Sequence, residues 1–183
     1  ILGLSVQIAV AALQTIPGYL DADYYFMGGK QLAEGKGFTE PFIWNYLDDP
    51  KGIPHPSHGY WMPLASLVAA VGMVLTGQTT YQAGRIGFIL LAALVPPLTA
   101  HLAFQFSKKT ALAWTSGLLA VFPIFHTPFL PVPDNYAIYM LAGGLFFLAA
   151  DQRMRPGSLT TDHPHMKHRG HKDDPLYRCP RRW

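Results

Sequence analysis

The sequence predicts an all-α, polytopic membrane protein with about four transmembrane helices, of which the first is truncated. Half of the 183 residues are hydrophobic and only 14% are charged, and the apolar residues come in long blocks. The single cysteine, Cys179, excludes a disulfide framework. The net charge of +3 comes from residues 151–183, so the composition gives no indication of nucleic-acid binding.

Four apolar blocks meet or approach the length of roughly 20 residues that a bilayer core of about 30 Å requires. They cover residues 1–16, 84–106, 110–129 and 135–154, and we expect the third to end near Pro123 or Pro128. The first block lacks the basic flank of a signal peptide, and we interpret it as the end of a transmembrane helix. Pro96-Pro97 predicts a kink in the second block. Gly143-Gly144 predicts close approach of another helix to the last.

The apolar block 62–76 decides the topology, because its helix of roughly 22 Å is shorter than the bilayer core. If it lies along the membrane face, loop 17–83 and residues 130–134 share one side, and the basic residues at 108–109 and 153–155 lie on the other. The positive-inside rule makes the basic side cytoplasmic. If block 62–76 crosses the membrane, the large loop lies on the same side as these basic residues and could itself be cytoplasmic. Helix length favours the first arrangement, with loop 17–83 extracytoplasmic and residues 151–183 cytoplasmic in the cell membrane.

Loop 17–83 opens with a segment, 17–61, that is too polar to span and too rich in aromatic residues for a disordered linker. We expect a short juxtamembrane helix over 23–34, ended by Gly35, and a turn over 48–52. Asp21 and Asp23 stand just outside the first apolar block. A carboxylate there can act as a general base, bind a divalent cation near a lipid phosphate, or cap the helix.

Three stretches resemble the GT-C superfamily of membrane glycosyltransferases, which includes protein O-mannosyltransferases, aminoarabinose transferases and oligosaccharyltransferases. Residues 19–38 resemble the first extracytoplasmic loop of that family, with acidic residues after the first span, then aromatics, a small helix and glycine. Residues 44–49 and 55–64 resemble the rest of the loop, which leads into a second juxtamembrane helix. Residues 131–136, with Asp134, stand where the family has a second acidic motif on the same membrane face.

The resemblance implies sugar transfer from a polyprenyl-phosphate-linked donor to an acceptor at the extracytoplasmic membrane surface. Asp21, alone or with Asp23, would be the catalytic carboxylate, and its spacing to Gly35 favours Asp21. Asp134 would bind a divalent cation or orient a substrate. Arg85 or Lys51 would supply positive charge beside the leaving phosphate.

The remaining candidates have plainer alternatives. Arg85 can also snorkel from the start of a span, and Asp134 can cap the last helix. His55 and His58 stand three residues apart, but Pro54 and Pro56 oppose a helix there. We therefore expect a loop pair that binds substrate or packs, in preference to a metal site.

Two other classes of membrane protein compete with the enzyme. A transporter or channel would line its path with Asp21 and Asp134, and would place acidic residues at the bilayer midplane or show inverted repeats. A non-catalytic scaffold would use the ordered loop for docking. The histidine-rich tail 156–183 has no regular ligand spacing and is expected to be disordered or artefactual. We expect the chain to be an N-terminal fragment that is inactive alone.

Overall fold

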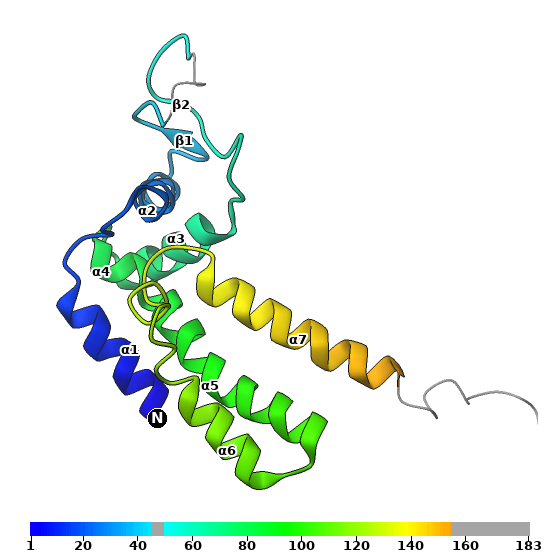
Figure 1. Cartoon of the computed structure of the whole chain (residues 1–183). Coiled ribbons are helices and arrows are strands. Elements are labelled where there is room, and N and C mark those ends of the chain that lie inside the picture. Colours follow the sequence, from blue (N-terminus) through cyan, green and yellow to red (C-terminus); the bar gives the residue numbers. More distant parts are fainter. Residues whose placement is uncertain (45–49, 155–183) are drawn as a thin grey trace, which may run out of the picture.

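A computed structural model describes residues 1–44 and 50–154, and helices hold 63% of these residues. The predicted turn 48–52 lies partly outside the described residues, and the tail 156–183 lies wholly outside them. Figure 1 shows the helices in chain order. The elements are α1 (Leu2–Leu13), α2 (Leu20–Ala33), β1 (Thr39–Glu40), β2 (His55–Pro56), α3 (Leu64–Thr76), α4 (Tyr81–Gly84), α5 (Ile86–Ser107), α6 (Thr110–Leu119) and α7 (Tyr136–Met154).

One helical stretch in the described part of the chain, Tyr81–Ser107, is long and apolar enough to span a membrane. It joins α4 to α5, and the 22 residues of α5 alone make about 33 Å of helix. The helix continues through Pro96-Pro97. Helices α1 and α3 are apolar but shorter, so the four-span arrangement stays a prediction.

Helix α6 contains 10 residues and ends at Leu119, so it is shorter than the predicted span 110–129. Pro123 explains this boundary. A proline in a helix has no N–H for the carbonyl four residues earlier, which here belongs to Leu119, and its ring clashes with that carbonyl. The chain between α6 and α7 is irregular, and it brings Asp134 back to the end of the molecule that holds α2.

Helices α2 and α3 pack closely because small residues line their contact. A Cβ atom added to Gly29 would lie 2.6 Å from the Cβ of Ala69. One added to Gly28 would lie 2.7 Å from the Ser66 hydroxyl oxygen. The core formed here includes Tyr24, Tyr25, Ala65, Ala69, Met73, Ala83 and Phe88. Side chains at these glycines would push α2 away from α3.

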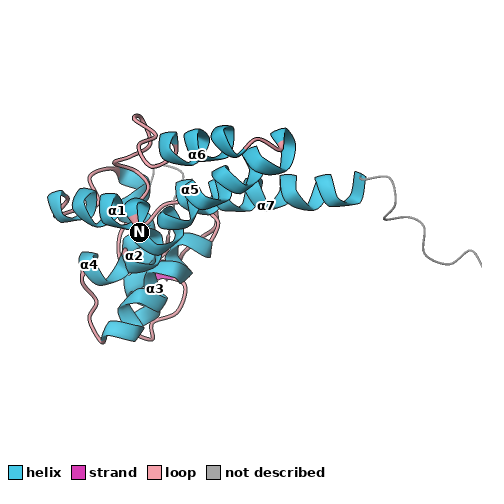
Figure 2. Cartoon of the chain, turned by 90° about the horizontal axis from the view of Figure 1, so that it is seen from below, coloured by secondary structure: helices cyan, strands magenta, loops and turns pink. Residues whose placement is uncertain are grey.

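Helices α2 and α3 run across the direction of α5, α6 and α7. Figure 1 shows α2 nearly end-on while α5 to α7 are seen from the side, and Figure 2 shows α3 crossing the direction of α5. This orientation is the one required if block 62–76 lies along a membrane face. The sidedness of the chain stays a prediction.

Glycines also set the contacts of α5 with α6 and α7. Gly117 of α6 faces Ala100, where an added Cβ would lie 2.9 Å from the Ala100 Cβ. Gly144 of α7 faces Leu98, with 2.5 Å to its Cδ2, whereas Gly143 has open space around it. The close approach predicted for Gly143-Gly144 therefore occurs at Gly144.

The start of α2 differs from the prediction, which placed the helix over 23–34. The helix begins at Leu20 after Tyr19, so Asp21 and Asp23 lie inside its first turn and cap nothing. Negative charge in a first turn is favourable because the exposed N–H groups there carry partial positive charge. Gly35 has φ +74, the left-handed conformation that the predicted helix stop requires.

Candidate functional site

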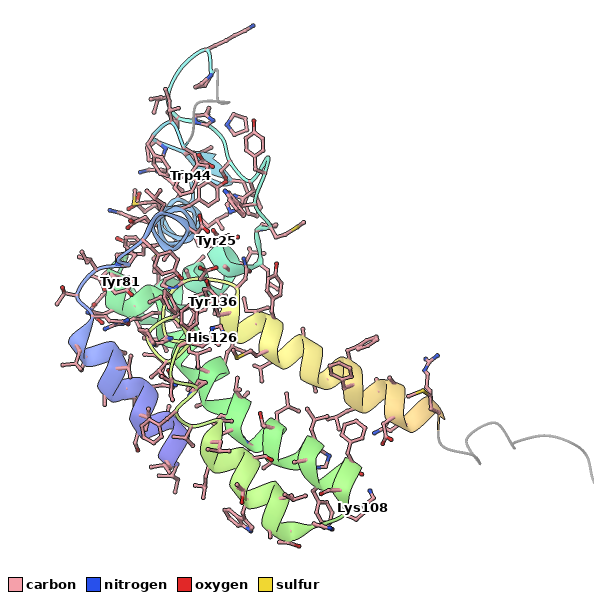
Figure 3. The ribbon with its side chains drawn as sticks, viewed as in Figure 1. Tyr25, Trp44, Tyr81, Lys108, His126 and Tyr136 are labelled. Atoms are coloured by element: carbon pink, nitrogen blue, oxygen red, sulfur yellow. The ribbon has the colours of Figure 1, made fainter. Side chains whose placement is uncertain are left out.

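A cavity of about 420 Å³ lies where α2, the segment before α3 and the start of α7 meet. Figure 3 shows Tyr25 and Tyr136 in this region, with Lys108 at the opposite end of α5. The cavity is lined by two carboxylates, five aromatic rings, one amide and one thioether: Asp21, Asp134, Tyr25, Tyr60, Trp61, Tyr136, Tyr139, Asn135 and Met62.

Helix geometry selects one of the two aspartates on α2. Asp21 and Tyr25 are four residues apart and therefore share a face, and both line the cavity. Asp23 is two residues from Asp21, about 200° around the helix, and its side chain is exposed outside the cavity. The structure therefore brings Asp21 to Asp134, without Asp23.

Asp134 is held in place by donors on both oxygens. The Tyr19 hydroxyl donates to Oδ2 at 2.6 Å, and the Asn135 backbone N–H donates to Oδ1 at 2.5 Å. The Asn135 amide in turn donates to the Tyr25 hydroxyl at 2.7 Å. These bonds tie residues 134–135 to α2 and its approach, and they fix the Asp134 carboxylate, which is 8% exposed.

The two carboxylates have different electrostatic environments. Burial, and then the negative charge of Asp134, raise the pKa of the Asp21 carboxyl above its ordinary value. Asp21 accepts no hydrogen bond within the described residues, whereas Asp134 accepts two. Burial also raises the pKa of Tyr25 to about 12, so this phenol stays protonated at neutral pH. Two carboxyls in unlike environments can divide proton transfer and charge stabilisation between them.

The cations expected at this site lie elsewhere. Arg85 is 2% exposed, and its guanidinium donates to the Ala11 carbonyl and the Gln82 amide oxygen. It also lies 4.7 Å from the centroid of the Tyr81 ring, and thus joins α1 to α4. Lys51 is exposed on the loop before β2. Neither lines the cavity, so a role for either beside a leaving phosphate stays a prediction.

His58 supports the fold near the site. Ser66 donates its hydroxyl proton to the Tyr25 carbonyl, so its oxygen accepts from Nε2–H of His58 at 2.9 Å. Nδ1 then accepts from the Ser57 hydroxyl at 2.6 Å. Burial lowers the pKa of His58, which favours the neutral imidazole in this pattern. The backbone N–H of His58 donates to the Tyr24 hydroxyl at 2.6 Å.

His55 has different partners, so the two histidines form no pair. Its Nε2 lies 2.9 Å from the Phe42 carbonyl oxygen and 4.0 Å from Oε2 of Glu40. Neither histidine lines the cavity, and their contacts fit the packing alternative, whereas a substrate contact stays a prediction. Within residues 1–44 and 50–154, no group of three or more His, Cys, Asp or Glu side chains is placed to hold a metal ion.

An apolar groove of about 640 Å³ begins beside the cavity, between α3, α5 and α7. Leu64 follows the cavity residue Met62 by two positions, and Ile138 precedes the cavity residue Tyr139. The groove is lined by Leu64, Val68, Leu91, Leu94, Pro97, Leu98, Ile138, Leu141, Ala142 and Leu145. Residues close in the chain therefore line both the carboxylate-containing cavity and the apolar groove.

Sequence reasoning did not single out Tyr19, Tyr25 and Asn135, which line the cavity or hold Asp134. The helical spacing from Asp21 to Tyr25 was a local signal that could have been used. The bond of Tyr19 to Asp134 has no local signal, because the residues are 115 positions apart.

Comparisons of the chain with protein-family models, curated proteins and solved structures found no match. The likeness to GT-C enzymes therefore depends on the short motifs alone. The fold and site define a mostly helical protein with one candidate membrane-spanning helix and a carboxylate-lined cavity.

Proposed function

We propose that the chain carries the reaction site of an integral-membrane glycosyltransferase that uses a polyprenyl-phosphate-linked sugar donor. One observation carries this proposal: Asp21, just after the first apolar helix, and Asp134, far along the chain, line the same cavity. A shared site for these two acidic motifs is what the resemblance to GT-C enzymes implies.

In the proposed reaction Asp21 is the general base. The acceptor hydroxyl oxygen attacks the anomeric carbon of the sugar, and its proton passes to the Asp21 carboxylate. The bond from the anomeric carbon to the lipid phosphate oxygen breaks, and its electron pair leaves with the phosphate. Direct displacement of this kind inverts the anomeric carbon. The raised pKa of Asp21 suits proton transfer, because a stronger base accepts the proton more readily.

Asp134 would position the acceptor, because Tyr19 and Asn135 already fix its orientation. The cavity suits the acceptor better than the donor phosphate, since two carboxylates repel an anion. The adjoining apolar groove supports a place for the donor's lipid chain, because its lining is entirely hydrophobic.

The activity test uses membranes from cells that express the protein from its natural gene. Radiolabelled polyprenyl-phosphate sugars are added, and loss of label from the lipid fraction is measured for the wild type, Asp21→Asn, Asp134→Asn and Asp23→Asn. We expect Asp21→Asn to slow transfer by about 10²–10⁴-fold, the usual contribution of a general base. Asp23→Asn is the matched control and should keep the wild-type rate, because Asp23 does not line the cavity.

The loss in Asp21→Asn would not reflect unfolding. A carboxyl whose pKa is higher in the folded chain destabilises the fold when it ionises, so removing its charge should leave stability at pH 7 unchanged or higher. Wild-type transfer by Asp21→Asn, or equal loss in Asp21→Asn and Asp23→Asn, would refute the proposed site.

The proposed topology places the cavity on the extracytoplasmic face. Single cysteines at the exposed positions Lys36 and Lys109, in a Cys179→Ser background, can be labelled on intact cells with a membrane-impermeant maleimide. Position 36 should react from outside and position 109 only after permeabilisation. Reaction of both positions from the same side would contradict this topology.

A further inference from the structure

The cavity has negative charge that no cationic side chain among its described lining residues balances. Its lining contains two carboxylates and, among the described residues, no lysine, arginine or histidine. Asp134 has donors for both oxygens, but Asp21 accepts no hydrogen bond in the described part of the chain. A partly buried carboxylate beside a second one is costly unless a positive group pairs with it.

Aromatic rings make up most of the remaining wall. Five rings line the cavity: Tyr25, Tyr60, Trp61, Tyr136 and Tyr139. The face of an aromatic ring attracts a cation by about 0.5–2 kcal/mol, with tryptophan the strongest. Tyr60, Trp61 and Tyr139 are 58%, 38% and 62% exposed, so part of this aromatic wall is open to an incoming group. Carboxylates and rings together favour a positive group that also has apolar surface.

A bare metal ion fits this lining poorly. Ca²⁺ takes six to eight oxygen ligands and Mg²⁺ demands an octahedron, whereas aromatic rings offer no such ligands. The described residues also lack a third acidic or histidine side chain placed to complete a metal site. The volume of about 420 Å³ exceeds what one ion needs, and it admits an organic group of several heavy atoms.

We propose that the cavity between α2 and α7 binds an organic ammonium group, paired with Asp21 and Asp134 and packed against the aromatic wall. This inference deepens the proposed function. Binding of the ammonium group is independent of that function, but its assignment to the acceptor of sugar transfer rests on it. The group would neutralise the cavity and hold the neighbouring acceptor hydroxyl near Asp21.

The binding test compares two probes that differ only in charge. Choline carries a quaternary ammonium, and 3,3-dimethylbutan-1-ol has the same shape with a neutral carbon in its place. The full chain is purified in detergent, and radiolabelled choline is measured by equilibrium dialysis, with the alcohol and Mg²⁺ as competitors. We expect choline to bind at least about ten-fold more tightly than the alcohol. Mg²⁺ should displace choline only at concentrations that act through ionic strength, as NaCl does.

Matched variants locate the site. Asp21→Asn and Trp61→Leu should each weaken choline binding by at least about five-fold, because each removes one attraction. The controls are Asp23→Asn, whose side chain is outside the cavity, and Trp114→Leu, whose exposed ring lies on α6. Both controls should bind choline as the wild type does.

Three results would overturn the inference. Equal affinity for choline and the alcohol would show that the positive charge does not contribute to binding. Unchanged choline binding in Asp21→Asn and Trp61→Leu would show that choline binds outside this cavity. Displacement by micromolar Mg²⁺ that depends on Asp21 would make the cavity a metal site. The outcomes separate from those of the transfer assay: choline binding without sugar transfer refutes only the glycosyltransferase, and transfer without choline binding refutes only this inference.

Discussion

The bond from Tyr19 to Asp134 gives the sharpest test of how the cavity is built. Tyr19→Phe deletes one hydroxyl and keeps the aromatic ring, which also makes an edge contact with Phe129 at 5.5 Å between centroids. The change leaves the mostly buried Asp134 with a single donor, the backbone N–H of Asn135. The expected effect is therefore that of removing a charge-assisted hydrogen bond.

The size of the effect follows from the geometry. A bond of 2.6 Å to a partly buried carboxylate belongs to the stronger class, which contributes about 1.5–3 kcal/mol. Such a loss would raise the unfolding equilibrium constant by about 10- to 150-fold. For a chain of this size, the thermal midpoint should fall by about 3–12 °C.

The assay is thermal unfolding of the purified chain in detergent, followed by tryptophan fluorescence. Tyr139→Phe is the matched control, because Tyr139 lines the same cavity and its hydroxyl has no hydrogen-bond partner within the described residues. We expect Tyr139→Phe to change stability by less than about 0.5 kcal/mol. If the two variants unfold at the same temperature, Tyr19 does not hold Asp134 and the cavity is assembled in another way.

Two further predictions concern the scaffold around the site. Gly72→Ala should lower the thermal midpoint, because the added Cβ would collide with the Ala83 carbonyl oxygen. Gly143→Ala is the control, and because its site is open space it should raise stability by up to about 1 kcal/mol. Equal shifts of the two midpoints would contradict the packing of α3 on α4. The lowered pKa of His58 means that the unfolded chain takes up its proton first, so stability should fall as pH drops below about 6.5. His58→Asn should flatten that decline in unfolding midpoints measured from pH 8 to 5, and an unchanged slope would assign the decline to other groups.

The sequence by itself determined most of the helices. The apolar blocks at 62–76, 84–106 and 135–154 correspond to α3, α5 and α7 within a few residues, because length and hydropathy are local properties. Gly35 follows the end of α2 as predicted, because its left-handed conformation turns the chain out of the helix and glycine adopts it without steric cost. The apolar pattern placed the end of α6 less well. The helix ends at Leu119 because Pro123 provides no N–H for the carbonyl of that residue.

The tertiary structure alone decided the composition of the site. The sequence offered Asp21, Asp23 and Asp134 together with two cations and one histidine pair, and packing kept only Asp21 and Asp134 together. Arg85 instead donates a hydrogen bond near the end of α1, and His58 is hydrogen-bonded to Ser66 on α3. Which side chains meet depends on how residues 134–135, just before α7, lie against α2. Hydrogen bonds between residues more than a hundred positions apart, Tyr19 with Asp134 and Tyr25 with Asn135, hold them there. No local pattern encodes such a meeting, because its energy exists only once the helices have packed.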